Sequence, residues 1–156
     1  MKLTKNFSLN ELTKSSTAVR LGIDNTPNSE HLVNMVNVCC HILQPVREHF
    51  GRVVTINSGY RSPKLNTAVN GSKTSQHCNG QAADFEIYNF PNHDLANWIK
   101  QNLDFDQLIL EFYNPKEGPN SGWVHCSYNL DGSNRKKVMT ALRINNKTQY
   151  KEGLVN

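Results

Sequence analysis

Apolar residues recur at three- and four-residue spacing across residues 29–50, at Leu32, Val36, Cys39, Leu43 and Val46. This spacing places them on one face and predicts a long amphipathic helix. Ser29 is the expected N-cap residue and Gly51 is expected to end the helix. Pro45 lies late in the segment and is expected to kink its last turns.

Alternation of apolar and polar residues predicts β-strands at residues 53–56, 82–87, 106–113, 123–128 and 138–144. In the second of these, Asp84 points away from the apolar face. Gln107 and Glu111 share one face of the third strand, and Trp123 and His125 share one face of the fourth. Polar side chains that share strand faces in this way are candidates for a common site.

Capping patterns predict three shorter helices, one opened by a capping box at Ser8, one by Ser62 and one by Asn89 or Asn92. Residues 17–28 are polar and contain a glycine and a proline, which predicts a loop. Asn-Gly pairs at 70–71 and 79–80 predict turns. Residues 114–122 read as a mobile loop, and the polar C-terminal dozen residues are expected to trail on the surface.

The order of these elements, helices first and then mostly strands joined by short turns, favours an α+β fold. We expect a central antiparallel sheet flanked by helices. With 156 residues, the chain is predicted to form one domain over residues 1–156, with a core at about 6–145 and a polar C-terminal tail. A hydrophobic fraction of 37% and a charged fraction of 19% are typical of a globular protein.

The net charge of +4 is mild, and Lys and Arg are scattered apart from the run Arg135 to Lys137. The sequence therefore offers no nucleic-acid-binding stripe, and a solvated turn explains that run better. A mildly basic surface would suit an anionic polymer such as cell wall. The four cysteines show no disulfide or CxxC pattern and are expected to be free thiols in a reducing cytosol.

The N-terminal segment lacks the apolar core of a signal peptide, and the chain has no long apolar run. We therefore expect synthesis in the cytoplasm without membrane insertion. A monomer is the expected state. A substrate outside the membrane would require another route of release.

His77 and Asp84 are candidate ligands of one metal ion. Fully extended, the residues between them would span roughly 23 Å, so both can bind one ion only if the chain folds back, and Gly80 permits that fold. His125, on a separate strand, is the candidate third ligand, and two nitrogens with one oxygen suit a catalytic zinc with an open position. Strand alternation argues against Cys126 as a ligand, whereas Cys78, on the loop, stays an alternative.

Four segments, SGYRSPKLN, SQHCNGQAAD, DQLILEF and WVHCSY, resemble the zinc D-alanyl-D-alanine carboxypeptidase family of murein peptidases. This family includes phage endolysins and cell-wall L,D-endopeptidases, and its metal site is similar to that of hedgehog signalling domains. The N-terminal segment NFSLNELTKSSTAVRLGIDN is similar to that of short phage and prophage forms. The resemblance covers residues 6 to about 130 and implies the fold of that family.

The resemblance implies that His77, Asp84 and His125 bind one Zn²⁺. It also implies that Arg61 binds the substrate near the scissile bond and that Ser75 lines the same pocket. Amide hydrolysis in the family uses a zinc-bound water activated by a carboxylate.

The chain departs from the family pattern at Gly122, because many members have the catalytic Asp or Glu at that position. Glu111 is our choice for the base, since it lies on the polar face of a predicted strand. Glu117, on the loop, and Glu86, on the face of Asp84, are the alternatives. Further candidates for the lining of the cleft are Tyr60, Gln107 and Trp123. Packing at the sheet edge would equally explain Tyr60 and Trp123. Gln107 could equally cap a turn.

The resemblance implies a zinc-dependent peptidase that cuts peptidoglycan stem peptides, as a D-Ala-D-Ala carboxypeptidase or an L,D-endopeptidase, in phage lysis or cell-wall remodelling. Release would then depend on a holin or on carriage in a virion. The alternative is a non-hydrolytic, zinc-stabilised cell-wall-binding or virion protein with the same metal ligands.

Overall fold

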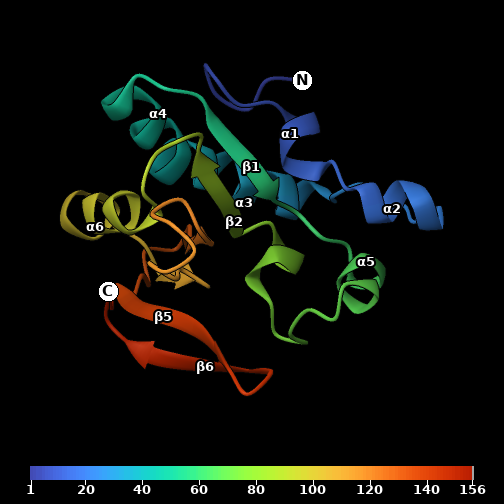
Figure 1. Ribbon diagram of the computed structural model, residues 1–156. Helices are drawn as coiled ribbons and strands as arrows, with labels where there is room; N and C mark the ends of the chain where they lie inside the picture. The colour runs from blue at the N-terminus through green and yellow to red at the C-terminus, as the bar shows by residue number, and fades with distance from the viewer. Residues whose placement is uncertain (156) are drawn as a thin grey trace.

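The computed structural model describes residues 1–155, which form a six-stranded sheet with helices against it (Figure 1). The strand order is β1-β2-β4-β3-β5-β6. The strands are β1 (Val54–Ser58), β2 (Ala82–Ile87), β3 (Gln107–Glu111), β4 (Trp123–Ser127), β5 (Lys137–Ile144) and β6 (Lys147–Glu152). Only β3 and β5 pair in parallel, and the other neighbours are antiparallel. The predicted α+β fold is confirmed, with a mixed, mostly antiparallel sheet.

The predicted helix at residues 29–50 is one helical run in three parts. It comprises α3 (Ser29–Val38), the π-helical segment η1 (Cys39–Leu43) and α4 (Gln44–Phe50). Asn28, rather than Ser29, is its N-cap and accepts a hydrogen bond from the amide of His31. The π-helical segment lies just before Pro45, where a proline removes one helical hydrogen bond, so the wider turn accommodates it. Gly51 ends the run in the left-handed conformation, as predicted.

The remaining helical elements are short, apart from the last one. They are α1 (Leu9–Thr13), α2 (Ser16–Leu21), α5 (Pro63–Ala68), the 3₁₀ segment η2 (Gln76–Asn79) and α6 (Asn92–Asn102). The capping box at Ser8 and the cap at Ser62 are both present. Pro91, and neither Asn89 nor Asn92, is the N-cap of α6. No helix among residues 1–155 is long and apolar enough to cross a membrane.

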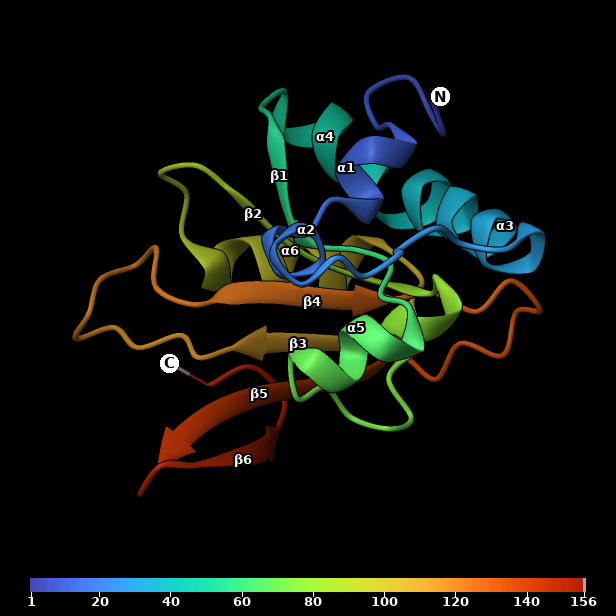
Figure 2. The same cartoon turned by 90° about the vertical axis from the view of Figure 1, so that its right-hand side faces the viewer.

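The two faces of the sheet differ. On the apolar face, side chains of α1, α3, η1, α4 and α6 pack against β1 to β4 in one core, which includes Ile42, Leu95, Phe85, Leu110 and Val124. In Figure 2, α6 lies behind the strands and α5 in front of them. Polar residues of β2, β3 and β4, namely Asp84, Gln107, Glu111 and His125, lie on the other face and line one cleft. Because successive strand residues face opposite sides, burial of one row holds the other row in place.

The predicted loop at residues 17–28 and the predicted C-terminal tail each contain a helix or strand that was not expected. Within residues 17–28, α2 forms because Ser15 caps it and Gly22 ends it with φ +65°. The expected C-terminal tail contains β6, which pairs with β5 through a turn at Asn145 and Asn146. These two residues have φ of 53° and 60°, the conformation of a tight hairpin turn that asparagine tolerates. Every residue of β6 is exposed. An exposed edge strand needs no apolar residues, and its polar composition was therefore interpreted as a tail.

All four cysteines are free thiols, and Cys40 is exposed rather than buried or half-buried as expected. Cys39 and Cys126 are buried, and burial raises the pKa of the Cys39 thiol to about 12. Cys126 lies in the core on the face of β4 opposite His125. Both buried thiols are therefore packing residues.

Candidate metal centre

His77 lies in η2, on a segment that folds back sharply between α5 and β2. The Ser75 hydroxyl accepts a hydrogen bond from the His77 amide at 3.2 Å. Gly80 ends η2 with φ +73°, and a Cβ there would lie 2.4 Å from the carbonyl oxygen of His31. Glycine is therefore required by both the backbone conformation and the close approach to α3. This is the predicted fold-back.

The segment Gly59–Arg61 fixes the imidazole of His77. Its Nδ1 lies 2.7 Å from the carbonyl oxygen of Gly59, which can only accept, so Nδ1 carries the proton and Nε2 is free to bind a metal. The amide of Arg61 donates to the His77 carbonyl at 3.1 Å. A Cβ at Gly59 would lie 2.3 Å from the carbonyl oxygen of Leu12. One segment, Gly59–Arg61, therefore holds both the ring and the backbone carbonyl of His77.

Asp84 and His125 are direct cross-strand partners on β2 and β4. His125 Nδ1 lies 2.9 Å from Asp84 Oδ1, and His77 Nε2 lies 3.3 Å from the same oxygen. One potential ligand atom from each of the three residues lies within 4.8 Å of the others. Cys78 does not belong to this cluster. We refer to His77, Asp84 and His125 as the triad.

Mutual interaction sets the charges in the triad. Burial disfavours ionisation of Asp84, but the electrostatic influence of His77 and the hydrogen bond from His125 hold its pKa well below the ordinary range. Burial lowers the pKa of His77. For His125, the hydrogen bond and charge of Asp84 outweigh burial and raise the pKa. An ionised carboxylate beside a neutral imidazole is the state that metal binding requires.

The donor set fits a zinc ion. Two imidazole nitrogens and one carboxylate oxygen converge, and His77 and His125 are only 2% and 8% exposed. Three protein ligands that leave one side open are typical of catalytic zinc sites. The hydrogen bond from His77 to the Gly59 carbonyl is the kind of outer contact that orients such a ligand.

Glu111 lies beside the triad. It pairs with Trp123 in the register that pairs Ile109 with His125, so its side chain shares their face. Burial, and then the charge of Asp84, raises the pKa of Glu111 to about 7. The Trp123 indole N–H opposes this shift, although it lies outside regular hydrogen-bond geometry with any acceptor of residues 1–155.

The backbone at Gly122 leaves no room for the acid that the resemblance led us to expect at this position. Its φ is +70°, and a Cβ there would lie 2.1 Å from the carbonyl oxygen of Glu111. The two residues are therefore packed backbone to backbone at the end of the β3–β4 pair. This close backbone contact leaves no room for a side chain at position 122. The same strand pairing places Glu111 opposite Trp123.

A cleft of about 780 Å³ runs over the triad. Four predicted residues line it, namely Arg61, Ser75, Gln107 and Trp123. Tyr60 does not, so that prediction is wrong. Its ring is 5% exposed and lies 5.5 Å from the His31 ring, because the amide of Tyr60 bonds to the carbonyl of Leu12 and turns the residue into the core.

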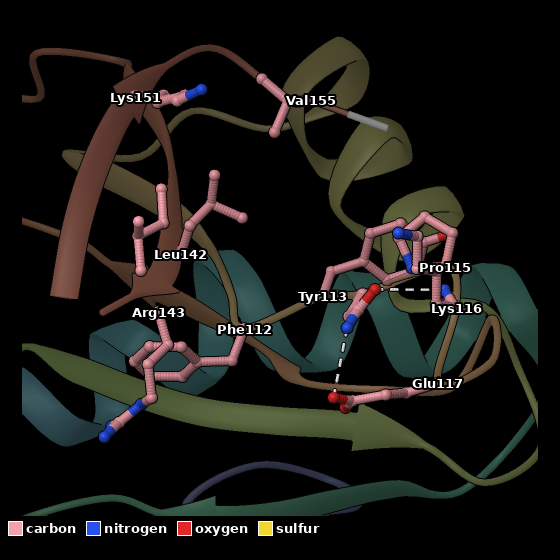
Figure 3. A pocket seen from close by; sticks show the side chains of 11 residues that line it. Phe112, Tyr113, Pro115, Lys116, Glu117, Leu142, Arg143, Lys151 and Val155 are labelled. Atoms are coloured by element: carbon pink, nitrogen blue, oxygen red, sulfur yellow. Dashed lines mark hydrogen bonds between the residues drawn. The ribbon is translucent and has the colours of Figure 1, made fainter. Parts of the chain in front are cut away.

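The other two acidic candidates lie outside the cleft. Glu86 accepts hydrogen bonds from Asn57 at 2.9 Å and Asn92 at 3.3 Å and does not line the cleft. Glu117 borders a second hollow of about 690 Å³, where it accepts a hydrogen bond from Asn114 (Figure 3). No triad residue lines that hollow.

Sequence reasoning missed part of the cleft. Gln76 and Arg135 also line the cleft, and both donate hydrogen bonds to the carboxylate of Asp106. The other missed residues are on β5 and β6: Met139, Arg143, Thr148 and Tyr150. Residues 138–144 were predicted to form a strand, but nothing predicted which face β5 presents to the cleft or that β6 exists.

The sequence model of the family described as Peptidase M15 matches residues 5–127. The chain belongs to the M15 peptidase family. No curated protein matches the chain. This M15 peptidase is therefore a metallopeptidase that acts on peptides, and the family's dependence on zinc agrees with the triad as a possible metal site. The match ends at Ser127, so β5 and β6 lie beyond it.

Proposed function

We propose that this M15 peptidase hydrolyses amide bonds in the stem peptides of peptidoglycan and that His77, Asp84 and His125 hold its zinc ion. One observation carries the proposal. Three converging ligand atoms lie within 4.8 Å of one another on the floor of a cleft, with Glu111 beside them. A metal ligand set and a separate carboxylate are the two parts that metal-assisted hydrolysis needs.

When bound, zinc supplies Lewis acidity, which polarises a carbonyl and makes water more acidic. The protein contributes the orientation of its ligands. The Gly59 carbonyl holds the His77 ring in one tautomer, and Asp84 stays ionised between two imidazoles.

Glu111 is the proposed general base and acid. Its carboxylate would take a proton from the attacking water and return it to the leaving amine. Burial in the cleft wall brings the pKa of Glu111 close to neutral, which suits a group that must both accept and donate a proton. A cation in the triad would lower that pKa and favour the basic form.

Arg61, Ser75, Gln107 and Trp123 are the proposed substrate contacts. Arg61 makes no ion pair with a carboxylate of residues 1–155, and its buried Nε has no hydrogen-bond partner there. A guanidinium in that condition would hold a carboxylate or carbonyl oxygen of the substrate. A terminal carboxylate at Arg61 would make the enzyme a D-Ala-D-Ala carboxypeptidase, and a chain that continues along the cleft would make it an L,D-endopeptidase.

We further propose a role in phage lysis or cell-wall remodelling, supported by the resemblance of the N-terminal segment to phage and prophage forms. The competing function is a non-hydrolytic cell-wall-binding or virion protein that keeps the triad. The near-neutral pKa and cleft position of Glu111 favour the enzyme.

Digestion of purified peptidoglycan, with and without a chelator, tests the proposal. We expect new peptides or free D-alanine, identified by mass, that disappear with chelator and return with zinc. The mass of the products distinguishes the two bonds. Binding of zinc and murein without any cleavage product would support the non-hydrolytic alternative.

A further inference from the structure

The β5–β6 hairpin adds a wall to the cleft that the family match does not cover. Residues 5–127 contain the triad and Glu111. The wall is built from later residues, Met139, Arg143, Thr148 and Tyr150. The wall therefore contains none of the triad residues. The chemistry of its side chains indicates which substrates it binds.

Strand register places the hairpin beside the proposed base. Glu111 pairs with Ala141 on β5, which pairs with Tyr150 on β6. The small Ala141 side chain between them leaves room for the phenol. Although Tyr150 is exposed, partial desolvation and then the charge of Glu111 raise its pKa, which agrees with this proximity. β5 continues past Glu111 to Ile144, so Arg143 and its partner Thr148 extend the wall beyond the base.

Arg143 is held in place but left without an anionic partner. Its guanidinium carbon lies 5.3 Å from the centre of the Phe112 ring, and Figure 3 shows the two side chains next to each other. The Phe112 ring lies 5.4 Å from that of Trp123. Arg143 makes no ion pair with a carboxylate of residues 1–155, whereas Arg135, the other cleft arginine beyond the match, is paired with Asp106.

The backbone at Phe112 supports a functional reason for this arrangement. Phe112 has φ +56°, which is unusual for a large aromatic residue and costs about 1–3 kcal/mol. That conformation turns the chain directly after Glu111, and the Phe112 amide donates to the Ala141 carbonyl at 2.8 Å. The ring thereby becomes a platform between Trp123 and Arg143.

The charge of the chain is concentrated in the same place. The hairpin, residues 137–152, holds four Lys and Arg side chains and one acid, Glu152, a net charge of +3, whereas the whole chain carries +4. Most of the net positive charge of the chain therefore lies in the hairpin. A cationic hairpin along one wall of a cleft attracts anionic substrates.

We propose that the β5–β6 hairpin is a second substrate-binding wall that selects acidic peptides, with Arg143 binding a substrate carboxylate at the opposite side of the cleft from Arg61. This inference rests on the proposed function and names a feature of its substrate. A planar guanidinium presented on an aromatic ring suits two parallel hydrogen bonds to a carboxylate.

A matched pair of stem peptides tests the proposal, one with a free side-chain carboxylate and one with that group amidated. We expect Arg143→Gln to raise KM for the acidic peptide roughly tenfold, about the size of one charge-assisted interaction, with kcat and the kinetics of the amidated peptide unchanged. Arg143→Lys should give an intermediate loss, because it keeps the charge without the planar fork. It also supplies the comparison if Arg143→Gln does not fold.

Lys147→Gln is the control, since Lys147 is exposed on the same hairpin and does not line the cleft. Equal effects of Arg143→Gln and Lys147→Gln, or equal losses for both peptides, would overturn the inference. Equilibrium binding of both labelled peptides is measured in parallel. If the wild type cleaves nothing, the proposed function fails, while selective loss of acidic-peptide binding in Arg143→Gln still supports the hairpin site.

Discussion

The triad and the β5–β6 hairpin border the same cleft but are constructed differently. His77 and His125 are buried, and the hydrogen bonds around them fix their rings before any ligand arrives. The residues of β6 are all exposed, and no charged side chain of the hairpin forms an ion pair within residues 1–155. A preorganised buried site suits chemistry that requires fixed distances. An exposed cationic surface suits recognition, which tolerates variation in the bound chain.

Changes in the triad should have the largest effects. Asp84→Asn removes the central ligand charge, and we expect loss of bound zinc with a fall in kcat/KM of about 10³-fold or more. Metal analysis and cleavage of a stem peptide measure both. Cys78→Ser is the control, because Cys78 lies next to His77 but outside the cluster. Zinc loss in Cys78→Ser would instead make that thiol a ligand.

Glu111→Gln should come next, with kcat reduced by about 10²–10⁴-fold, the usual contribution of general acid–base catalysis. Zinc content should be unchanged, because Glu111 is not part of the cluster. Glu86→Gln and Glu117→Gln are matched controls that lie outside the cleft. If Glu111→Gln stayed active while one of the control variants lost activity, the general base would be that other glutamate.

Gly122→Asp introduces an acid at the position where the resemblance led us to expect one, and it should destabilise the protein by about 3 kcal/mol. Both its φ of +70° and the contact of a Cβ with the Glu111 carbonyl oppose any side chain there. Chemical denaturation measures the loss, and Gly122→Ala should show most of it. If Gly122→Asp folded normally and rescued Glu111→Gln, the two positions would be interchangeable, contrary to this geometry.

The sequence predicted the triad because its signals are local. Gly80 marks the fold-back, and alternation along two strands orients Asp84 and His125 toward each other. The position of Glu111 followed from alternation for the same reason. These features depend on a few neighbouring residues and on the apolar rows that bury the opposite face.

The hairpin could not be predicted in the same way. The strand at residues 138–144 was predicted, but β6 has no apolar pattern because it is a fully exposed edge strand. Pairing of β5 with β3 is a long-range contact that no local spacing encodes. Tyr60 is the opposite case, because it was predicted to line the cleft but is buried in the core. An aromatic residue next to a site arginine in sequence can face either way.

The dependence of stability on pH should reveal the environment of Glu111 in the metal-free protein. Its pKa rises from an ordinary 4.5 to about 7 on folding, so the folded state holds a proton that the unfolded chain has lost. Stability therefore falls as pH rises through this window. Glu111→Gln should unfold like the wild type at pH 4 and be more stable at pH 8, by no more than about 3 kcal/mol. If the stability of Glu111→Gln and of the wild type changed with pH in the same way, Glu111 could not have the raised pKa that its surroundings give it.

The smallest effect should come from the hairpin turn. Asn146 has φ +60°, where glycine is unstrained, so Asn146→Gly should stabilise the folded state by roughly 0.5 kcal/mol. Thermal unfolding measures this, and zinc content and kcat should not change, because the turn is remote from the triad. Asn146→Ala is the control and should be destabilising, since alanine lacks asparagine's tolerance of this conformation. A change in kcat with either variant would mean that the hairpin acts on the chemistry itself, and the division between a rigid reaction site and a separate recognition wall would no longer hold.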